Sequence, residues 1–137
     1  MTVIADTWPH YALLDSSDAG HERVVAWWRE QPRSVVIPIP VLPEVAYLLQ
    51  ARIGHEAEHA FIRAVADSEF VTETLEPEDI VRAAALIHDY ADVPLGFVDA
   101  AIVATAERLG VRQILTTDRR HFGVVQPLHT RAFALLP

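Results

Sequence analysis

Four acidic residues stand at positions where a lone carboxylate is unfavourable, and together they could hold a metal ion. Asp6 and Asp118 each follow a short run of residues typical of a buried strand. Glu44 and Asp99 lie among apolar residues of two predicted helices, at spacings that place them on the apolar faces. An ionised carboxylate on an apolar surface costs free energy unless something compensates it. We therefore expect a cation near these residues.

The expected cation is Mg²⁺, and Mn²⁺ could replace it. Hard divalent cations prefer oxygen ligands, and four converging carboxylates cannot all stay ionised without a counter-charge. The usual chemistry of such a centre is phosphoryl hydrolysis, in which the metal lowers the pKa of an attacking water and holds the phosphate. The chain contains no cysteine, so a thiolate zinc site and a disulfide framework are both excluded.

Each acid taken alone also has an ordinary structural explanation. Asp6 could be a turn residue, and Glu44 and Asp99 could be first-turn residues that the helix dipole favours. Asp118 could cap a turn that runs to Phe122. The joint occurrence of two acids on apolar helix faces and two acids after strands favours a shared site over four separate explanations.

The elements that must position the four acids alternate between strands and helices. Strands are predicted over 3–5, 34–37, 70–72 and 113–117, with short edge strands over 124–125 and 133–136. Helices are predicted over 9–14, 21–32, 40–52, 55–67, 77–90 and 97–110. This alternation predicts one α/β domain over residues 1–137, with a mostly parallel sheet flanked by helices. Ligands bind at the C-terminal edge of such a sheet, where all four acids can meet.

Two of the predicted helices carry specific expectations. The Asp99 helix follows Pro94 and Gly96 and ends at Gly110, where a left-handed cap residue is favoured. Pro32 is expected to end the helix that begins near residue 21. For the helix over 77–90, the inward face is predicted to consist of Ile80, Ala83, Ala84 and Ile87.

Composition limits the class of protein. The chain has 137 residues, of which 51% are hydrophobic, which is enough for one domain with a substantial core. No basic leader precedes an apolar run, and no apolar stretch approaches the roughly 20 residues of a membrane helix. We therefore expect a cytoplasmic protein with no membrane contact. The formal charge of −8 argues against nucleic-acid binding, although two bound divalent cations would halve it.

The absence of lysine disfavours several other classes of Mg²⁺-binding protein. All 11 basic residues are arginine. Receiver domains and haloacid-dehalogenase-like phosphatases also place acids at strand ends, but they use a lysine to meet the phosphoryl charge. No phosphate-binding G-x-x-x-x-G-K-[ST] segment is present. These classes are therefore disfavoured.

One segment matches a short zinc protease motif. His55, Glu56 and His59 match H-E-x-x-H. Two histidines at this spacing share a helix face and could bind zinc with a third ligand. No third ligand is evident nearby, and so short a motif recurs by chance. We therefore interpret the segment as a surface helix, and the scattered remaining histidines as ordinary surface or core residues.

Four features occur in a fixed order: an Asp after the first strand, a Glu on an early helix, the run GFVDAAIVATAERLG and the run ILTTDRRHF. In this order the sequence resembles a PIN domain, specifically the VapC toxins of bacterial type II toxin–antitoxin systems. The resemblance covers essentially the whole chain and implies a Mg²⁺-dependent ribonuclease. The catalytic and metal-binding residues implied by the resemblance are Asp6, Glu44, Asp99 and Asp118.

The resemblance also carries expectations about the surroundings of the site. Thr7 matches a small hydroxyl residue that often follows the first Asp, whereas the segment 8–10, Trp-Pro-His, departs from the family pattern. The family implies homodimers and a VapB-like antitoxin whose tail enters the active site.

A ribonuclease of this charge also needs contacts for RNA. We interpret Arg119 and Arg120 as RNA-binding residues, and Arg108 and Arg112 as further parts of a positive rim. The alternative function is a catalytically silent PIN-like module that binds RNA or protein. The presence of all four acids argues against it, because an acidic pocket without a cation repels a polyanion.

Overall fold

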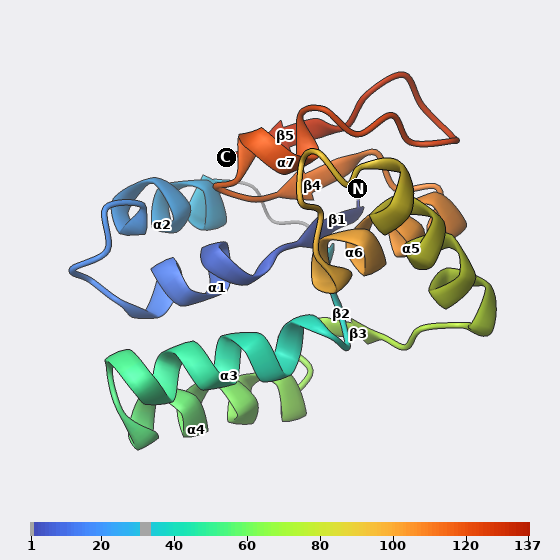
Figure 1. Cartoon of the computed structure of the whole chain (residues 1–137). Helices are drawn as coiled ribbons and strands as arrows, with labels where there is room; N and C mark the ends of the chain where they lie inside the picture. The colour runs from blue at the N-terminus through green and yellow to red at the C-terminus, as the bar shows by residue number, and fades with distance from the viewer. Residues whose placement is uncertain (1, 31–33) are drawn as a thin grey trace.

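The computed structural model describes residues 2–30 and 34–137, so the helix end predicted at Pro32 lies outside the described residues. The strands are β1 (Thr2–Ala5), β2 (Ser34–Pro38), β3 (Val71–Glu73), β4 (Gln113–Leu115) and β5 (Ala134–Leu136). The helices are α1 (Thr7–Leu14), α2 (His21–Glu30), α3 (Val41–Arg52), α4 (His55–Ala66), α5 (Pro77–Asp89), α6 (Phe97–Leu109) and α7 (Arg119–Phe122). Figure 1 shows the strands in the middle of the molecule with helices around them.

All five strands of the sheet are parallel, in the order β3-β2-β1-β4-β5. The central strand is β1, whose apolar residues 3–5 are fully buried, as expected for a parallel strand covered on both faces. Ile4 pairs with Val36 on one side and with Ile114 on the other. The predicted α/β class with a parallel sheet is therefore confirmed, and the ends of β1 and β4 lie side by side.

Helix α6 is the most deeply buried helix element beside the sheet. Every residue from 100 to 106 is buried, and Gly110 ends the helix in the left-handed region at φ 68°, as predicted. The helices α3 and α4 form a hairpin that packs against α1 (Figure 1). The buried middle of α6 anchors the helix in the core, and Asp99 stands in its first turn, directly before the buried segment.

Two details at the C-terminal side differ from the prediction. Strand β4 ends at Leu115 rather than at residue 117, although the Thr116 N–H still donates to the Leu136 carbonyl at 2.7 Å while its hydroxyl donates to Asp6. The edge strand predicted over 124–125 is absent: Val124 lies in a turn, and Val125 is buried in the core without belonging to a strand. The edge strand predicted over 133–136 is confirmed as β5, which pairs with β4.

The predicted inward face of α5 is largely wrong. Ala83 is buried as expected, but Ile80 and Ile87 are 53% and 38% exposed. The buried positions are instead Asp79, Ala83 and Leu86. Counting apolar residues alone misplaced the face, because charged side chains of α5 turn inward to pair with α6.

Ion pairs join α5 to the C-terminal half of α6. Asp79 is 2% exposed, and its carboxylate accepts from the Arg108 Nε atom at 2.9 Å and from the backbone N–H of Glu76 at 2.9 Å. Arg82 donates to Glu107 at 2.8 Å. Asp79 therefore caps the start of α5 and also neutralises Arg108, which is a structural use of a buried acid.

A buried histidine lies where α1 meets its neighbours. The His10 ring packs against Trp28, Phe61 and Phe70, and neither ring nitrogen has a hydrogen-bond partner within the described residues. Complete burial lowers the pKa of His10 to about 4. The imidazole is therefore neutral at pH 7 and serves as an aromatic packing group.

In the part of the chain that the structure covers, each helix is too short or too polar to cross a lipid bilayer.

Candidate active site

The four predicted acids line one pocket of about 330 Å³ at the C-terminal edge of the sheet. The pocket is lined by Asp6, Trp8, Glu44, Gly96, Phe97, Val98, Asp99, Asp118 and His121. These residues come from the ends of β1 and β4 and the starts of α1, α3, α6 and α7. The predicted convergence of the acids therefore holds in the fold.

Asp6 is the most buried of the four acids, at 5% exposure. Its carboxylate accepts from the backbone N–H of Thr7 at 2.7 Å and from the Thr116 hydroxyl at 2.9 Å, so it caps α1 and ties β1 to β4. Burial, together with the nearby charges of Asp99 and Glu44, raises the pKa of Asp6 to about 7 despite these hydrogen bonds. A cation in the pocket would favour the ionised form.

Asp99 sits in the first turn of α6 and is partly buried. Its pKa is raised, first by burial and then by the charges of Asp118 and Glu44, against an opposing effect of His121. The position of Asp99 at a helix N-terminus favours its ionised form only in part. Asp6 and Asp99 are thus two neighbouring carboxylates whose pKa values are both raised, with His121 partly offsetting the effect at Asp99.

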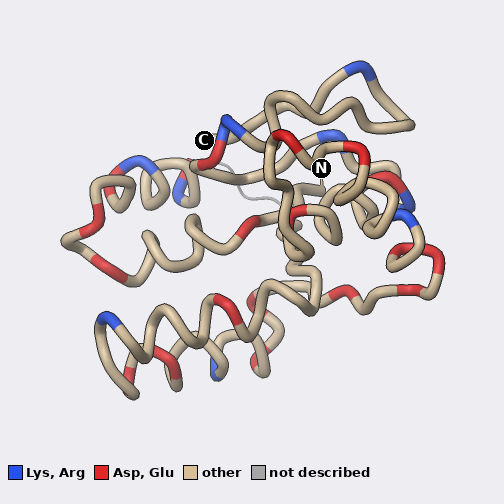
Figure 2. Tube along the Cα trace, in the orientation of Figure 1, with Lys and Arg blue, Asp and Glu red and all other residues tan. Residues whose placement is uncertain are grey.

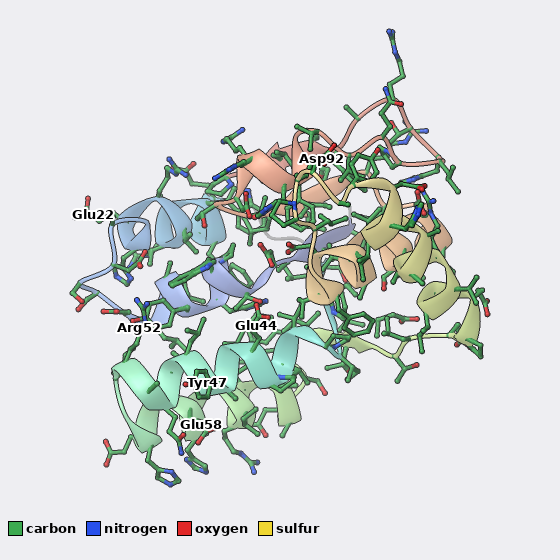
Figure 3. The ribbon with its side chains drawn as sticks, in the orientation of Figure 1. Glu22, Glu44, Tyr47, Arg52, Glu58 and Asp92 are labelled. Atoms are coloured by element: carbon green, nitrogen blue, oxygen red, sulfur yellow. The ribbon has the colours of Figure 1, made fainter. Side chains whose placement is uncertain are left out.

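Glu44 differs from its predicted placement. The buried stripe of α3 consists of Val41, Val45 and Leu49, whereas Glu44 is exposed and turns toward the pocket (Figure 3). The Thr7 hydroxyl donates to its Oε1 atom at 2.6 Å. Because Thr7 is buried directly after Asp6, this bond fixes the position of Glu44 relative to the first strand.

Asp118 and His121 form a pair on the opposite wall. Asp118 accepts from the backbone N–H groups of Arg120 and His121 at 3.0 Å each, so it caps α7 as well as lining the pocket. The Nδ1 atom of His121 lies 2.5 Å from Asp118 Oδ2 and 3.9 Å from Asp99 Oδ2. Partial burial raises the pKa of Asp118, but the bonds and charge of His121 outweigh burial and lower it. The Asp118 carboxylate in turn raises the pKa of His121.

The donor set of this pocket suits a divalent cation. It offers carboxylate oxygens, which hard divalent cations prefer. The most buried of these carboxylates, Asp6, forms no ion pair with an arginine among the described residues. Within residues 2–30 and 34–137, however, no three histidine or acidic side chains already stand close enough together to ligate one ion. The same holds for His55 and His59, which lie exposed on α4.

The predicted positive rim is only half present. Arg108 is wrong for this role because it pairs with Asp79 and Glu73 at the far end of α6. Arg112 is also wrong, because it precedes β4 and so lies at the opposite edge of the sheet from Asp118. Arg119 and Arg120 are exposed on α7 directly after Asp118. Figure 2 shows basic positions spread over many elements rather than gathered in one stripe.

His121 is the site residue that sequence reasoning missed. Seven scattered histidines gave no reason to single it out. The available signal was its spacing, because a residue three positions after a helix-capping Asp faces that Asp across the first turn. Short α7 was predicted only as a turn, so this geometry was not considered.

Comparison with known proteins places these observations in context. The PIN domain family matches residues 3–126. Ribonuclease VapC26 of Mycobacterium tuberculosis is 32% identical over 135 residues, which is 98% of this chain and 100% of that protein. The crystal structure of VapC20 of Mycobacterium tuberculosis, described as a sarcin–ricin loop cleaving toxin, superposes with a TM-score of 0.84 at 23% identity, covering 94% of this chain and 98% of that one. A toxin–antitoxin complex from Klebsiella pneumoniae has a TM-score of 0.70 at 20% identity, covering 96% and 99%.

Proposed function

This chain belongs to the PIN domain family and is a VapC-type ribonuclease toxin, and on that premise we propose that the acidic pocket is where it hydrolyses RNA. The supporting observation is the buried, uncompensated carboxylate of Asp6 beside Asp99 and Glu44. We also propose that the domain extends beyond the family match to residue 137, because β5 completes the sheet.

We propose Mg²⁺, with Mn²⁺ as a substitute, as the resident ion, held by Asp6, Glu44, Asp99 and Asp118. When bound, such an ion supplies an acidified water and neutralises charge that develops on the phosphate. The carboxylates of Asp6 and Asp99 hold the negative charge that attracts it. Despite partial burial, the hydrogen bonds and charge of His121 lower the pKa of Asp118, which favours the carboxylate form that a cation requires.

The remaining groups orient the ligands. Thr7 donates to Glu44 and Thr116 donates to Asp6, so two hydroxyl groups fix two carboxylates on adjoining walls. Glu44 is the exposed member of the set and is placed to orient a water molecule rather than to carry most of the charge. Arg119 and Arg120, beside Asp118, are proposed to contact the RNA backbone.

The alternative is a silent module that binds RNA or protein without cleaving it. Asp6 and Asp99 argue against it, because both have raised pKa values and neither has an arginine partner within the described residues. Such a pocket repels phosphate unless it holds a cation, and a purely binding surface gains nothing from it.

The proposed partners follow from the family. We propose that a VapB-like antitoxin binds this chain and blocks the pocket; the supporting observation is that a chain of the Klebsiella toxin–antitoxin complex has the same fold. We further propose that the chain acts as a homodimer and that its substrate is RNA.

Product analysis tests the mechanism. A random single-stranded RNA pool should be cleaved in Mg²⁺ or Mn²⁺, and EDTA should abolish cleavage. Attack by a water in line with the 3′-oxygen gives 5′-phosphate and 3′-hydroxyl ends. Asp99→Asn should remove most activity, whereas the exposed Asp92→Asn (Figure 3) should retain it. Cyclic phosphate ends, or full cleavage in EDTA, would overturn the metal mechanism.

Growth of bacteria tests the toxin role. Expression of the wild-type chain without an antitoxin should arrest growth, and Asp99→Asn should not. Equal toxicity of the two proteins would show that the Asp99 carboxylate is not required.

A further inference from the structure

A second pocket adjoins the acidic pocket and shares one wall with it. This neighbouring pocket has a volume of about 310 Å³ and is lined by Trp8, Asp18, Ala19, Gly20, Arg23 and Thr117. Trp8 lines both pockets and is the residue that they share. Thr117 lines the neighbouring pocket and Asp118, the next residue, lines the acidic pocket, so the two pockets also meet at this point of the chain.

The Trp8 side chain is held in place while part of it stays accessible. The Arg52 guanidinium lies over the indole, 5.2 Å from the ring centroid, and the Tyr11 ring meets it edge-on at 5.3 Å. Figure 3 shows Arg52 on the side of α3 that faces α1. A half-buried aromatic ring fixed by a cation and a second ring can accept a planar partner with little loss of side-chain entropy.

The polar groups of the neighbouring pocket are of mixed kind. Arg23 is exposed and makes no ion pair with any described residue, so its guanidinium can meet a phosphate. Asp18 accepts from the backbone N–H of Gly20 at 2.8 Å, and carboxylate oxygens accept from hydroxyl or amino groups as well. A cation, an acceptor and an aromatic wall together match a nucleotide, which has a phosphate, a ribose and a flat base.

We propose that this neighbouring pocket binds the nucleotide next to the scissile phosphate of a single-stranded RNA, with Trp8 stacking on its base and Arg23 contacting its phosphate. This assignment rests on the proposed hydrolysis of RNA in the acidic pocket. It also gives a use to Trp8, which belongs to the segment 8–10 that departs from the family pattern. Stacking does not depend on base identity, so Trp8 raises affinity and sets strand register rather than reading sequence.

An abasic substrate tests the assignment without altering the protein. From an RNA that the wild-type chain cleaves, a series is made in which single nucleotides flanking the cut lack their base. One flanking position should raise the KM of the wild type by about 10- to 100-fold, the effect of losing one stacked base. On the intact RNA, Trp8→Leu should raise KM by the same factor. On the RNA that is abasic at that position, Trp8→Leu should raise KM no further, because the two changes remove the same contact.

Matched variants separate stacking from structure. Trp8→Phe keeps an aromatic face and should stay within a few-fold of the wild type, and Tyr47→Leu, on the outer surface of α3 (Figure 3), should have no effect. Arg23→Gln should raise KM and weaken its salt dependence, whereas the exposed Arg131→Gln should not.

The outcomes distinguish this assignment from the proposed function. Suppose that the wild type cleaves RNA, that Trp8→Leu has the wild-type KM on intact RNA, and that no abasic substrate raises the KM of the wild type. The neighbouring pocket then does not bind a base. A loss of kcat in Trp8→Leu that is equal on intact and abasic RNA would make Trp8 a structural wall and would also overturn the assignment. Absence of any cleavage by the wild type in Mg²⁺ and Mn²⁺ would instead refute the proposed function.

Discussion

Two aspartates of this molecule are almost equally buried and yet are surrounded in opposite ways. Asp79 is 2% exposed and meets Arg108 at 2.9 Å, while Asp6 is 5% exposed and has the carboxylates of Asp99 and Glu44 as its nearest charges. The first is a closed ion pair that joins two helices. The second is an acid that accepts two hydrogen bonds but has no cationic partner among the described residues. Burial of an acid alone therefore does not point to a functional site, whereas a buried acid with no compensating cation among the described residues is the stronger candidate.

The largest expected effect comes from breaking the closed pair. Asp79→Asn removes a buried acid and leaves the partly exposed Arg108 with Glu73 as its remaining acidic partner, and we expect the free energy of unfolding to fall by about 3 kcal/mol. Denaturant unfolding measures this change. RNA cleavage by the variant at low temperature should stay near the wild-type rate, and a comparable loss of activity in the folded variant would contradict the division between the two aspartates.

The complementary change is Asp6→Asn. It removes the uncompensated charge, so the protein without metal should keep or raise its melting temperature. RNA cleavage should fall by about 10²–10³-fold, as on losing one electrostatic group of an active site. Single-turnover kinetics and thermal melting measure the two quantities. A protein that is strongly destabilised and fully active would reverse the roles that we assign to Asp6 and Asp79.

Metal should stabilise the fold in a pH-dependent way. The pKa of Asp6 is raised from 3.8 to about 7, so its contribution to stability is present below pH 4 and is lost as pH rises through about 7. A cation reverses that loss, and at 100 times its dissociation constant it adds about 2.7 kcal/mol. The shift in melting temperature on adding Mn²⁺ should be larger at pH 8 than at pH 6. Equal shifts in wild type and Asp6→Asn would argue against this site.

The smallest effect is expected at Glu44. This side chain is exposed, and Gln at position 44 can still accept from the Thr7 hydroxyl. Glu44→Gln should therefore lower cleavage by about tenfold, or about 1.4 kcal/mol. A loss as large as that of Asp6→Asn, measured under the same single-turnover conditions, would show that solvent exposure does not reduce the weight of an acid in this pocket.

The same comparison explains how far the sequence could be interpreted. Asp99 was predictable because it stands on the apolar face of a helix, which periodicity detects, and Asp6 because it directly follows a buried strand. The buried role of Asp79 was not predictable. An acid in the first turn of a helix is common, and its partner Arg108 lies 29 positions away in the sequence. The face of α5 was misplaced for the same reason: pairing between distant charged residues leaves no local pattern. His121 depends on a four-residue helix whose existence follows from the cap that Asp118 provides.

The ring of His10 bears on the order in which the molecule comes apart. Its pKa is lowered to about 4 by burial, so stability is lost as pH falls below 6.5 and continues to be lost down to about 4. The proton that enters must separate α1 from Trp28, Phe61 and Phe70, which belong to three different segments. Acid unfolding is thus expected to begin where α1 contacts these rings, so that the wall carrying Thr7 and Trp8 loosens while the five-stranded sheet is still intact.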